Sequence, residues 1–149
     1  MRQGVRICCD VGTVRVGLAR CDSHGLLASP LPAVAAQGAI AAVADLVHEV
    51  EAIEVVVGLP LRLDGSTGPA AEQARDWASS LRQALAASGS SAEVNLVDER
   101  LTTVQAQRRL HDAGRNTRSS RRSIDSAAAV VLLQGHLDQI RGQSTGGAR

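Results

Sequence analysis

Phenylalanine, tyrosine and lysine are absent from this sequence, and Trp77 is its only tryptophan. The core must therefore consist mainly of alanine, valine and leucine side chains. With 44% hydrophobic and 21% charged residues, the composition is nonetheless typical of a globular protein. A chain of 149 residues is also long enough to bury a core without disulfides or structural metals. The absence of lysine leaves all sixteen basic residues as arginines, which by itself indicates no mechanism.

Long apolar runs and paired cysteines are missing as well. No stretch approaches the roughly 20 apolar residues that a membrane helix needs, and the N-terminal "MRQGVRICCD" lacks the apolar core of a signal peptide. The three cysteines have neither C-x-x-C nor zinc-type spacing, so we expect a cytoplasmic protein. Cys8 and Cys9 should point to opposite faces of a strand. Cys21 is expected to be exposed, as a free thiol rather than an intermolecular disulfide.

The apolar pattern predicts an α/β fold with one mixed sheet. Val5–Cys9 and Val14–Ala19 are predicted to form an antiparallel hairpin, followed by an edge strand in "LLASPLPAV" because of its prolines. "IEVVVG" is typical of a central parallel strand, and "EVNLV" is the last strand. Helices are predicted at about 39–51, along the apolar face of Ala74, Trp77, Ala78, Leu81 and Leu85, at about 103–112 and at about 121–140. We expect one domain over residues 1–141 and a disordered tail over 142–149.

Three carboxylates are predicted to meet at one end of this sheet. Asp10 ends the first strand, and Asp98 and Glu99 follow the last. Sites of α/β sheets form beyond the carboxyl ends of the strands. Asp125 shares the apolar stripe of the last helix, near its first turn. Each acid alone is equally well explained in another way. Asp10 is then a turn residue, Asp125 a charge that stabilises a helix N-terminus, and Glu99 an ion-pair partner of Arg100.

Taken together, Asp10, Glu99 and Asp125 predict a divalent cation, with Asp98 as the alternative to Glu99. Like charges held close together raise one another's pKa, and a metal ion removes this conflict. Oxygen ligands without neighbouring histidine or cysteine favour Mg²⁺ or Mn²⁺ over zinc. Two such ions clamp the attacking and leaving oxygens of a phosphodiester, so the acids indicate phosphodiester chemistry.

The segment from Arg100 to Arg122 is strongly basic. It contains seven arginines and one acid, Asp112, which gives a local charge of +6, and because the whole chain carries +1 the remainder carries −5. Positive potential beside an acidic site suits a phosphate backbone, whereas the alternative is a solvated helix face and loop. The predicted nucleic-acid-binding residues are Arg15, Arg100, Arg118, Arg121 and Arg122.

Four motifs occur in order between about Val5 and Leu137: "DVGTVRVGLA", "VVGLPLRLDGS", "VDERLTT" and "IDSAAAVVLLQGHL". They resemble the YqgF/RuvX family, Holliday-junction-resolvase-like proteins of the RNase H-like superfamily. The resemblance implies an RNase H-like fold, a five-stranded mixed sheet with an antiparallel second strand, and a metal-dependent nuclease. The family's acids correspond to Asp10, Glu99 and Asp125. The first motif departs at Val14, where a basic residue is frequent, but retains Arg15.

The resemblance leaves the substrate open. Family members are linked to maturation of the 5′ end of 16S ribosomal RNA, and some are described as Holliday junction resolvases. Resolution of branched DNA needs two copies, most simply a C₂ dimer, whereas trimming an RNA needs one active site. The sequence has no strong apolar stripe for a dimer, so we expect a monomer or weak homodimer and rank processing of precursor ribosomal RNA first.

Two other classes of protein share features with the chain. "DVGT" also resembles the phosphate loop of actin-like ATPases, which bind ATP and Mg²⁺ between two lobes, but this chain has room for only one. A non-catalytic RNA-binding factor of ribosome assembly would have no need for the intact set of acids.

Overall fold

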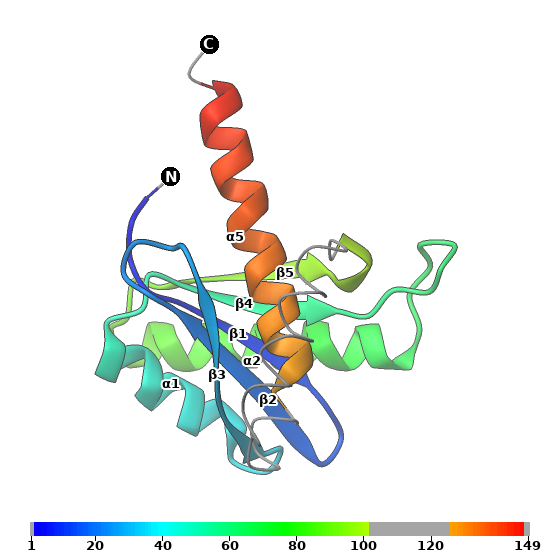
Figure 1. Cartoon of the computed structure of the whole chain (residues 1–149). Helices are drawn as coiled ribbons and strands as arrows, with labels where there is room; N and C mark the ends of the chain where they lie inside the picture. Colours follow the sequence, from blue (N-terminus) through cyan, green and yellow to red (C-terminus); the bar gives the residue numbers. More distant parts are fainter. Residues whose placement is uncertain (1, 102–125, 148–149) are drawn as a thin grey trace.

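The computed structural model describes residues 2–101 and 126–147, which form a mixed sheet with helices on both faces (Figure 1). The strand order is β3-β2-β1-β4-β5. The strands are β1 (Arg6–Val11), β2 (Arg15–Cys21), β3 (Ala28–Ala35), β4 (Glu54–Leu59) and β5 (Glu93–Asp98). Because β2 is antiparallel to β1 and β3, while β1, β4 and β5 are parallel, the predicted mixed sheet with an antiparallel second strand is confirmed.

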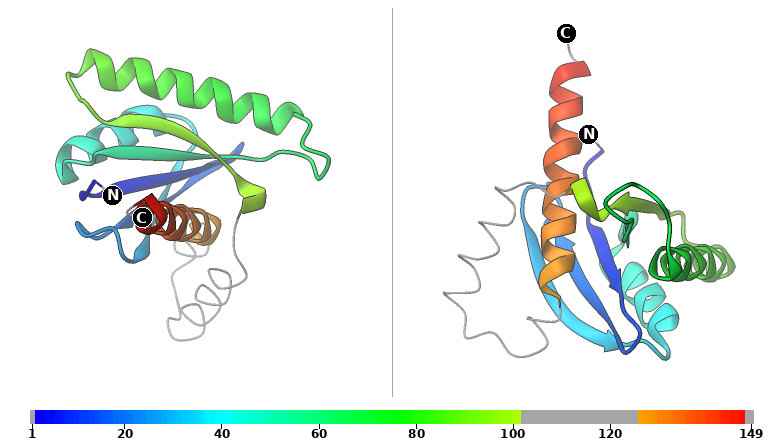
Figure 2. Two further views of the ribbon diagram at one scale, coloured as in Figure 1. Left: turned by 90° about the horizontal axis from the view of Figure 1, so that it is seen from above. Right: turned by 90° about the vertical axis from the view of Figure 1, so that its right-hand side faces the viewer.

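The described helices lie in two layers. α1 (Ala39–Val50) and α2 (Pro69–Ala87) cover one face of the sheet, and the long helix α5 (Ala127–Gly147) covers the other (Figure 2). A short 3₁₀ turn, η1 (Glu99–Leu101), follows β5 directly. No helix within the described residues is long and apolar enough to cross a membrane.

Strand alternation divides the core between the two faces. Cys9, Val55 and Val57 pack in the core beneath α1 and α2, whereas Cys8 and Val56 pack beneath α5. The prediction that the adjacent cysteines point to opposite faces is confirmed. β4 is apolar on both sides because both are covered, which explains its unbroken run of valines.

Glycine and proline mark where two of the helices begin. Gly38 precedes α1 with a φ of 84°, in the left-handed region that favours glycine. Pro69 occupies the first turn of α2, where a missing N–H costs no hydrogen bond. The predicted apolar face of α2 is confirmed: its buried residues are Ala71, Ala74, Ala78, Leu81 and Leu85.

The prediction that Cys21 is exposed was wrong. Cys21 is the last residue of β2 and packs in the core beneath α5, where only 1% of its surface is exposed. Its Sγ accepts a hydrogen bond from the backbone N–H of Arg6 at 3.2 Å. The side chain is therefore part of the core and unavailable for a disulfide between molecules.

The last helix also differs from its prediction. α5 continues to Gly147, past the predicted end at Ile140, so residues 142–147 of the predicted tail are helical. The helix predicted at about 103–112 and the arginine-rich loop after it lie outside the described residues. That residues 1–141 form an independent domain stays a prediction.

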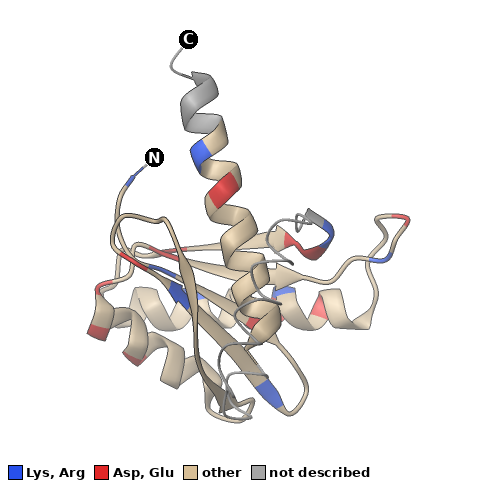
Figure 3. Cartoon of the chain, in the orientation of Figure 1, with Lys and Arg blue, Asp and Glu red and all other residues tan. Residues whose placement is uncertain are grey.

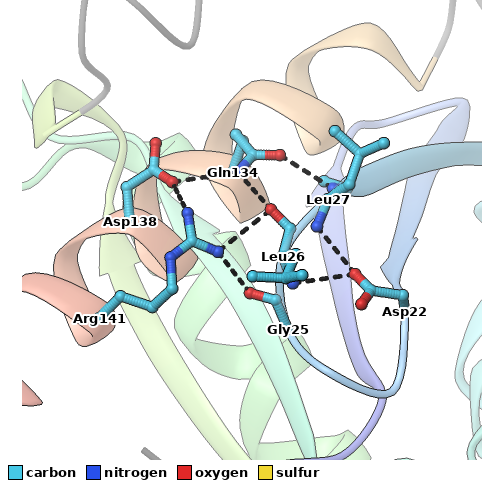
Figure 4. Close-up of polar contacts among 8 residues, drawn as sticks. Asp22, Gly25, Leu26, Leu27, Gln134, Asp138 and Arg141 are labelled. Atoms are coloured by element: carbon cyan, nitrogen blue, oxygen red, sulfur yellow. Dashed lines mark hydrogen bonds and ion pairs between the residues drawn. The ribbon is translucent and has the colours of Figure 1, made fainter.

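Polar contacts join the β2–β3 turn to α5 (Figure 4). The Asp22 carboxylate closes the turn by accepting a hydrogen bond from the backbone N–H of Leu27 at 2.8 Å. The side chains of Gln134 and Arg141 in α5 both donate to the carbonyl of Leu26, each at 3.1 Å. The middle of α5 is thus held against the sheet edge by directional bonds in addition to its apolar face.

Candidate metal and nucleic-acid site

Asp10 lies near the carboxyl end of β1, just before the hairpin turn. Cys9 pairs in register with Val57 of β4, so continuing the same parallel register places Asp10 beside Gly58. On its other side, Asp10 pairs with Gly17 of β2. Both neighbours of Asp10 in the sheet thus lack side chains, so side chains from other elements can approach its half-buried carboxylate.

Glu99 reaches Asp10 by crossing β4. The residue follows Asp98 at the end of β5, and β4 lies between β5 and β1. A Cβ atom on Gly58 would lie 2.7 Å from Oε1 of Glu99 and 2.8 Å from Cδ1 of Leu132 in α5. The Glu99 side chain therefore lies over the bare backbone of β4, next to α5, where it hydrogen-bonds with Asp10.

Burial and repulsion shift the ionisation of this pair. Burial, followed by the negative charge of Asp10, raises the pKa of Glu99 to about 7. Burial also raises the pKa of Asp10, although the hydrogen bond from Glu99 partly opposes this. The raised pKa of Glu99 favours one proton on the pair near neutral pH. A cation placed between them would take over the neutralising role of that proton.

The third predicted acid, Asp125, lies outside the described residues, but the next residue is well defined. Ser126 is fully buried at the start of α5. Its Oγ donates to the carbonyl of Leu31 at 2.6 Å and accepts from the N–H of Leu18 at 3.0 Å. The β2–β3 register shifts just before Leu18, which explains why these backbone groups take a side-chain partner. The position that follows Asp125 is thus held on β2, the strand that pairs with β1.

Asp98, the alternative to Glu99, is bound to Arg100. The Arg100 guanidinium lies 2.7 Å from Oδ2 of Asp98, and the backbone N–H of Arg100 donates to Oδ1 at 2.9 Å. These contacts lower the pKa of Asp98. Arg100 also donates to the carbonyl of Leu63 at 3.3 Å, in the loop between β4 and α2. The structure therefore brings Glu99, and not Asp98, to Asp10.

The predicted nucleic-acid-binding arginines are only partly placed. Arg15 is exposed at the start of β2, in the turn closed by the bond from the Gly12 N–H to its carbonyl at 3.0 Å. Arg15 and Arg100 thus lie at the same end of the sheet as Asp10. The remaining predicted residues, Arg118, Arg121 and Arg122, lie outside the described residues. A role in binding nucleic acid stays a prediction for all five arginines.

The chemistry of the donor set fits a hard divalent cation. Asp10 and Glu99 offer carboxylate oxygens, which Mg²⁺ and Mn²⁺ prefer. Burial raises the pKa of the neighbouring Cys8 well above its ordinary value, so this thiol stays neutral and is a poor ligand. Within the described residues, no group of three or more His, Cys, Asp or Glu side chains is arranged to hold a metal ion.

Sequence reasoning missed two residues that build the site. Gly58 admits the Glu99 side chain, and a glycine inside a β-branched strand often marks such a close approach. Ser126 holds the start of α5, and a serine directly before an apolar helix is a common N-terminal residue. Both signals were present in the sequence.

Sequence comparisons place the chain among nucleases. The family model for RuvX, described as Holliday junction resolvase, matches residues 4–139. A protein of Kineococcus radiotolerans is 49% identical over 145 residues, which cover 95% of this chain and 75% of the relative. A protein of Streptomyces coelicolor is 44% identical over 144 residues, which cover 95% of this chain and 84% of the relative. Both carry the name "Putative pre-16S rRNA nuclease".

Solved structures share the fold at low sequence identity. Thermus thermophilus RuvC in complex with a Holliday junction substrate matches with a TM-score of 0.65 and 17% identity, over 94% of this chain and 96% of that one. The yeast mitochondrial Holliday junction resolvase matches with a TM-score of 0.52 and 10% identity, over 89% and 77%. These likenesses confirm the predicted RNase H-like fold class.

Proposed function

Since the chain belongs to the RuvX family, as its four motifs predict, we propose that it is a divalent-metal-dependent nuclease that matures the 5′ end of precursor 16S ribosomal RNA. The observation that carries the proposal is the half-buried pair of Asp10 and Glu99, which lie together at the carboxyl end of the sheet. Family membership favours this function over an actin-like ATPase, and the intact acid pair favours it over a non-catalytic RNA-binding factor.

In this proposal, Asp10 and Glu99 hold Mg²⁺ or Mn²⁺ together with Asp125. When bound, the cation supplies charge neutralisation at the phosphodiester that is cut. Both carboxylates would be ionised when they hold the cation, because a bound positive charge favours the charged form of nearby acids. Gly58 leaves the Glu99 side chain room to reach Asp10, and packing next to α5 keeps the carboxylate partly out of water.

The substrate is inferred from the relatives and from charge. Relatives at 44–49% identity are named for precursor 16S ribosomal RNA, which supports RNA as the substrate. We assign phosphate contacts to Arg15, Arg100, Arg118, Arg121 and Arg122, and Arg100 has an additional structural role through its pair with Asp98. The protein would act in the cytoplasm as a monomer or weak homodimer, because trimming one RNA end requires one active site.

Resolution of Holliday junctions is the second candidate function. The family's description and the RuvC-like fold favour it. It would require two copies that face one junction, because two related strands must be nicked.

A cleavage panel separates these functions. The substrates are precursor 16S ribosomal RNA, an unrelated single-stranded RNA and a four-way DNA junction, each with Mg²⁺, with Mn²⁺ and with a chelator. We expect metal-dependent cleavage of the precursor RNA, lost in Asp10→Asn and kept in the matched control Asp45→Asn, an exposed acid of α1. Cleavage by Asp10→Asn at the wild-type rate would refute the metal site. Symmetric nicking of the junction without cleavage of the RNA would favour the resolvase.

A further inference from the structure

A groove of about 540 Å³ lies along α2, on the opposite side of the sheet from α5. Ile40 of α1 forms one wall, and a stripe of α2 that includes Pro69, Glu72, Asp76 and Trp77 forms the other. These α2 positions are spaced i, i+3, i+7 and i+8, so they lie on one continuous helix face. The groove is separate from the Asp10–Glu99 pair, which lies on the α5 side.

The groove combines an apolar floor with an acidic rim. Ile40 and Trp77 are half-buried, so part of each side chain remains accessible. Glu72 and Asp76 are exposed and four residues apart, on the same side of the helix. Arg75 pairs with Glu72 at 3.6 Å, but both side chains are about half exposed, and such surface pairs exchange readily.

The groove itself carries a net negative charge. Its lining includes two acids, Glu72 and Asp76, and no arginine, so the lining residues together carry −2. Figure 3 shows acidic positions on both helices of this face, α1 and α2. Arg82 does not line the groove, and its guanidinium donates to the carbonyl of Val94 at 3.0 Å.

We propose that this groove binds a basic, arginine-containing segment of a partner protein. Charge complementarity selects this occupant, since nucleic-acid phosphates would be repelled by Glu72 and Asp76. A guanidinium can stack on the indole of Trp77 and pair with both acids at once, which an ammonium group does less well. Proteins that bind RNA carry such segments to neutralise phosphates, and one could dock here while nucleic acid occupies the opposite face.

Trp77 provides a direct reporter of the groove. The chain has no other tryptophan and no tyrosine, so its intrinsic fluorescence comes from this position alone. The probe is a short capped peptide of alternating arginine and glycine, titrated into the full-length protein at low salt. We expect a saturable change in Trp77 emission that weakens as salt is added. A peptide of the same length with glutamate in place of arginine should cause no change.

Charge variants decide whether the groove is the binding site. Glu72→Gln/Asp76→Asn should weaken peptide binding by about tenfold, because two charge contacts are lost. The matched control Asp45→Asn/Glu49→Gln, which removes the same charge from α1 outside the groove, should bind as the wild type does. Asp10→Asn should also bind normally, which keeps this result independent of the nuclease site.

Two outcomes would overturn the proposal. Equal affinity of the groove variant and its α1 control would show that the peptide responds only to overall charge. A change of Trp77 emission with protein concentration alone, together with a dimer in light scattering that the groove variant abolishes, would assign the groove to a second copy of this chain.

Discussion

Carboxylates lie at both ends of the α5 face of the sheet, in opposite surroundings. Glu54 begins β4 and accepts hydrogen bonds from Arg6 Nε at 2.9 Å and Asn95 Nδ2 at 2.7 Å, and it lies 3.1 Å from His136 Nε2. Burial alone would raise the pKa of Glu54, but the bonds from His136 and Asn95 and the nearby positive charges outweigh it and lower the pKa to about 2.

At the other end, the charges that act on Glu99 come from acids. Burial and the charges of Asp10 and Asp98 raise the pKa of Glu99 to about 7. The same sheet thus places cationic and amide partners around Glu54, whereas the charged groups that raise the pKa of Glu99 are acids. A buried carboxylate with cationic partners is therefore expected to stabilise the fold, whereas one beside other acids is a candidate for a functional site.

Isosteric neutralisation of each carboxylate is the strongest test of this comparison. Glu54→Gln should lower the free energy of unfolding at pH 7 by about 3 kcal/mol, because it leaves the buried Arg6 charge without its counter-ion. Asp10→Asn should leave it unchanged or raise it by about 1 kcal/mol, because repulsion with Glu99 is relieved. Urea denaturation of both variants measures the difference. Equal destabilisation of the two would contradict the comparison.

Acid should act on the Glu54 end of the sheet first. Its folded pKa of about 2 lies below the ordinary 4.5, so the stability it contributes is present above pH 4.5 and is lost as the pH falls towards 2. Between pH 6 and pH 3 the wild type should lose about 2 kcal/mol more of its free energy of unfolding than Glu54→Gln does. Urea titrations of the wild type and of Glu54→Gln across this pH range measure the difference. Identical pH profiles of the two proteins would show that the ion pair of Glu54 does not cause the loss of stability in acid.

Gly58 tests how Glu99 reaches Asp10. In Gly58→Ala the new methyl group would displace the Glu99 carboxylate, and we expect cleavage to fall about tenfold with a smaller loss of stability. Gly142→Ala is the matched control, since a Cβ there meets nothing within 4 Å. Cleavage by Gly58→Ala as fast as by Gly142→Ala would show that Glu99 does not act from its position over β4.

Metal addition should give the smallest effect. Mg²⁺ at about five to ten times its dissociation constant should raise the free energy of unfolding of the wild type by about 1 kcal/mol. Asp10→Asn should show no such gain, whereas Glu54→Gln should keep it despite its lower stability. Thermal unfolding with and without Mg²⁺ measures this, and an equal gain in Asp10→Asn would place the metal elsewhere.

The sequence predicted most of the fold because its signals are local. The apolar runs located the strands, the prolines of β3 marked an edge strand, and Pro69 lies in the first turn of α2. Cys21 was misjudged because its neighbour Asp22 looked like the start of an exposed turn. The turn does begin there, but the packing of α5 over the end of β2 buries the cysteine itself.

The sequence indicated which acids form the candidate site, but it did not indicate how their side chains meet. Position at strand ends identified Asp10 and Glu99, yet local pattern does not show that a side chain crosses a neighbouring strand. That crossing depends on Gly58 and on the register between β1 and β4, which are tertiary properties. The same holds for Arg100, whose basic character predicted a phosphate contact and whose partner in the structure is Asp98.

The arrangement of α5 has a consequence for the growing chain. Residues 6–98 supply all five strands of the sheet together with α1 and α2, so this layer can form while the chain is still being synthesised. The opposite face, with Cys8 and Val56, is covered only after Ala127 and the residues beyond it have left the ribosome. Until then Glu99 is more exposed to water, so the burial that contributes to its raised pKa is weaker, although the charges of Asp10 and Asp98 still raise it. A nascent or truncated chain that lacks α5 would thus hold both acids without the apolar cover of the finished fold, and we expect nuclease chemistry to require α5.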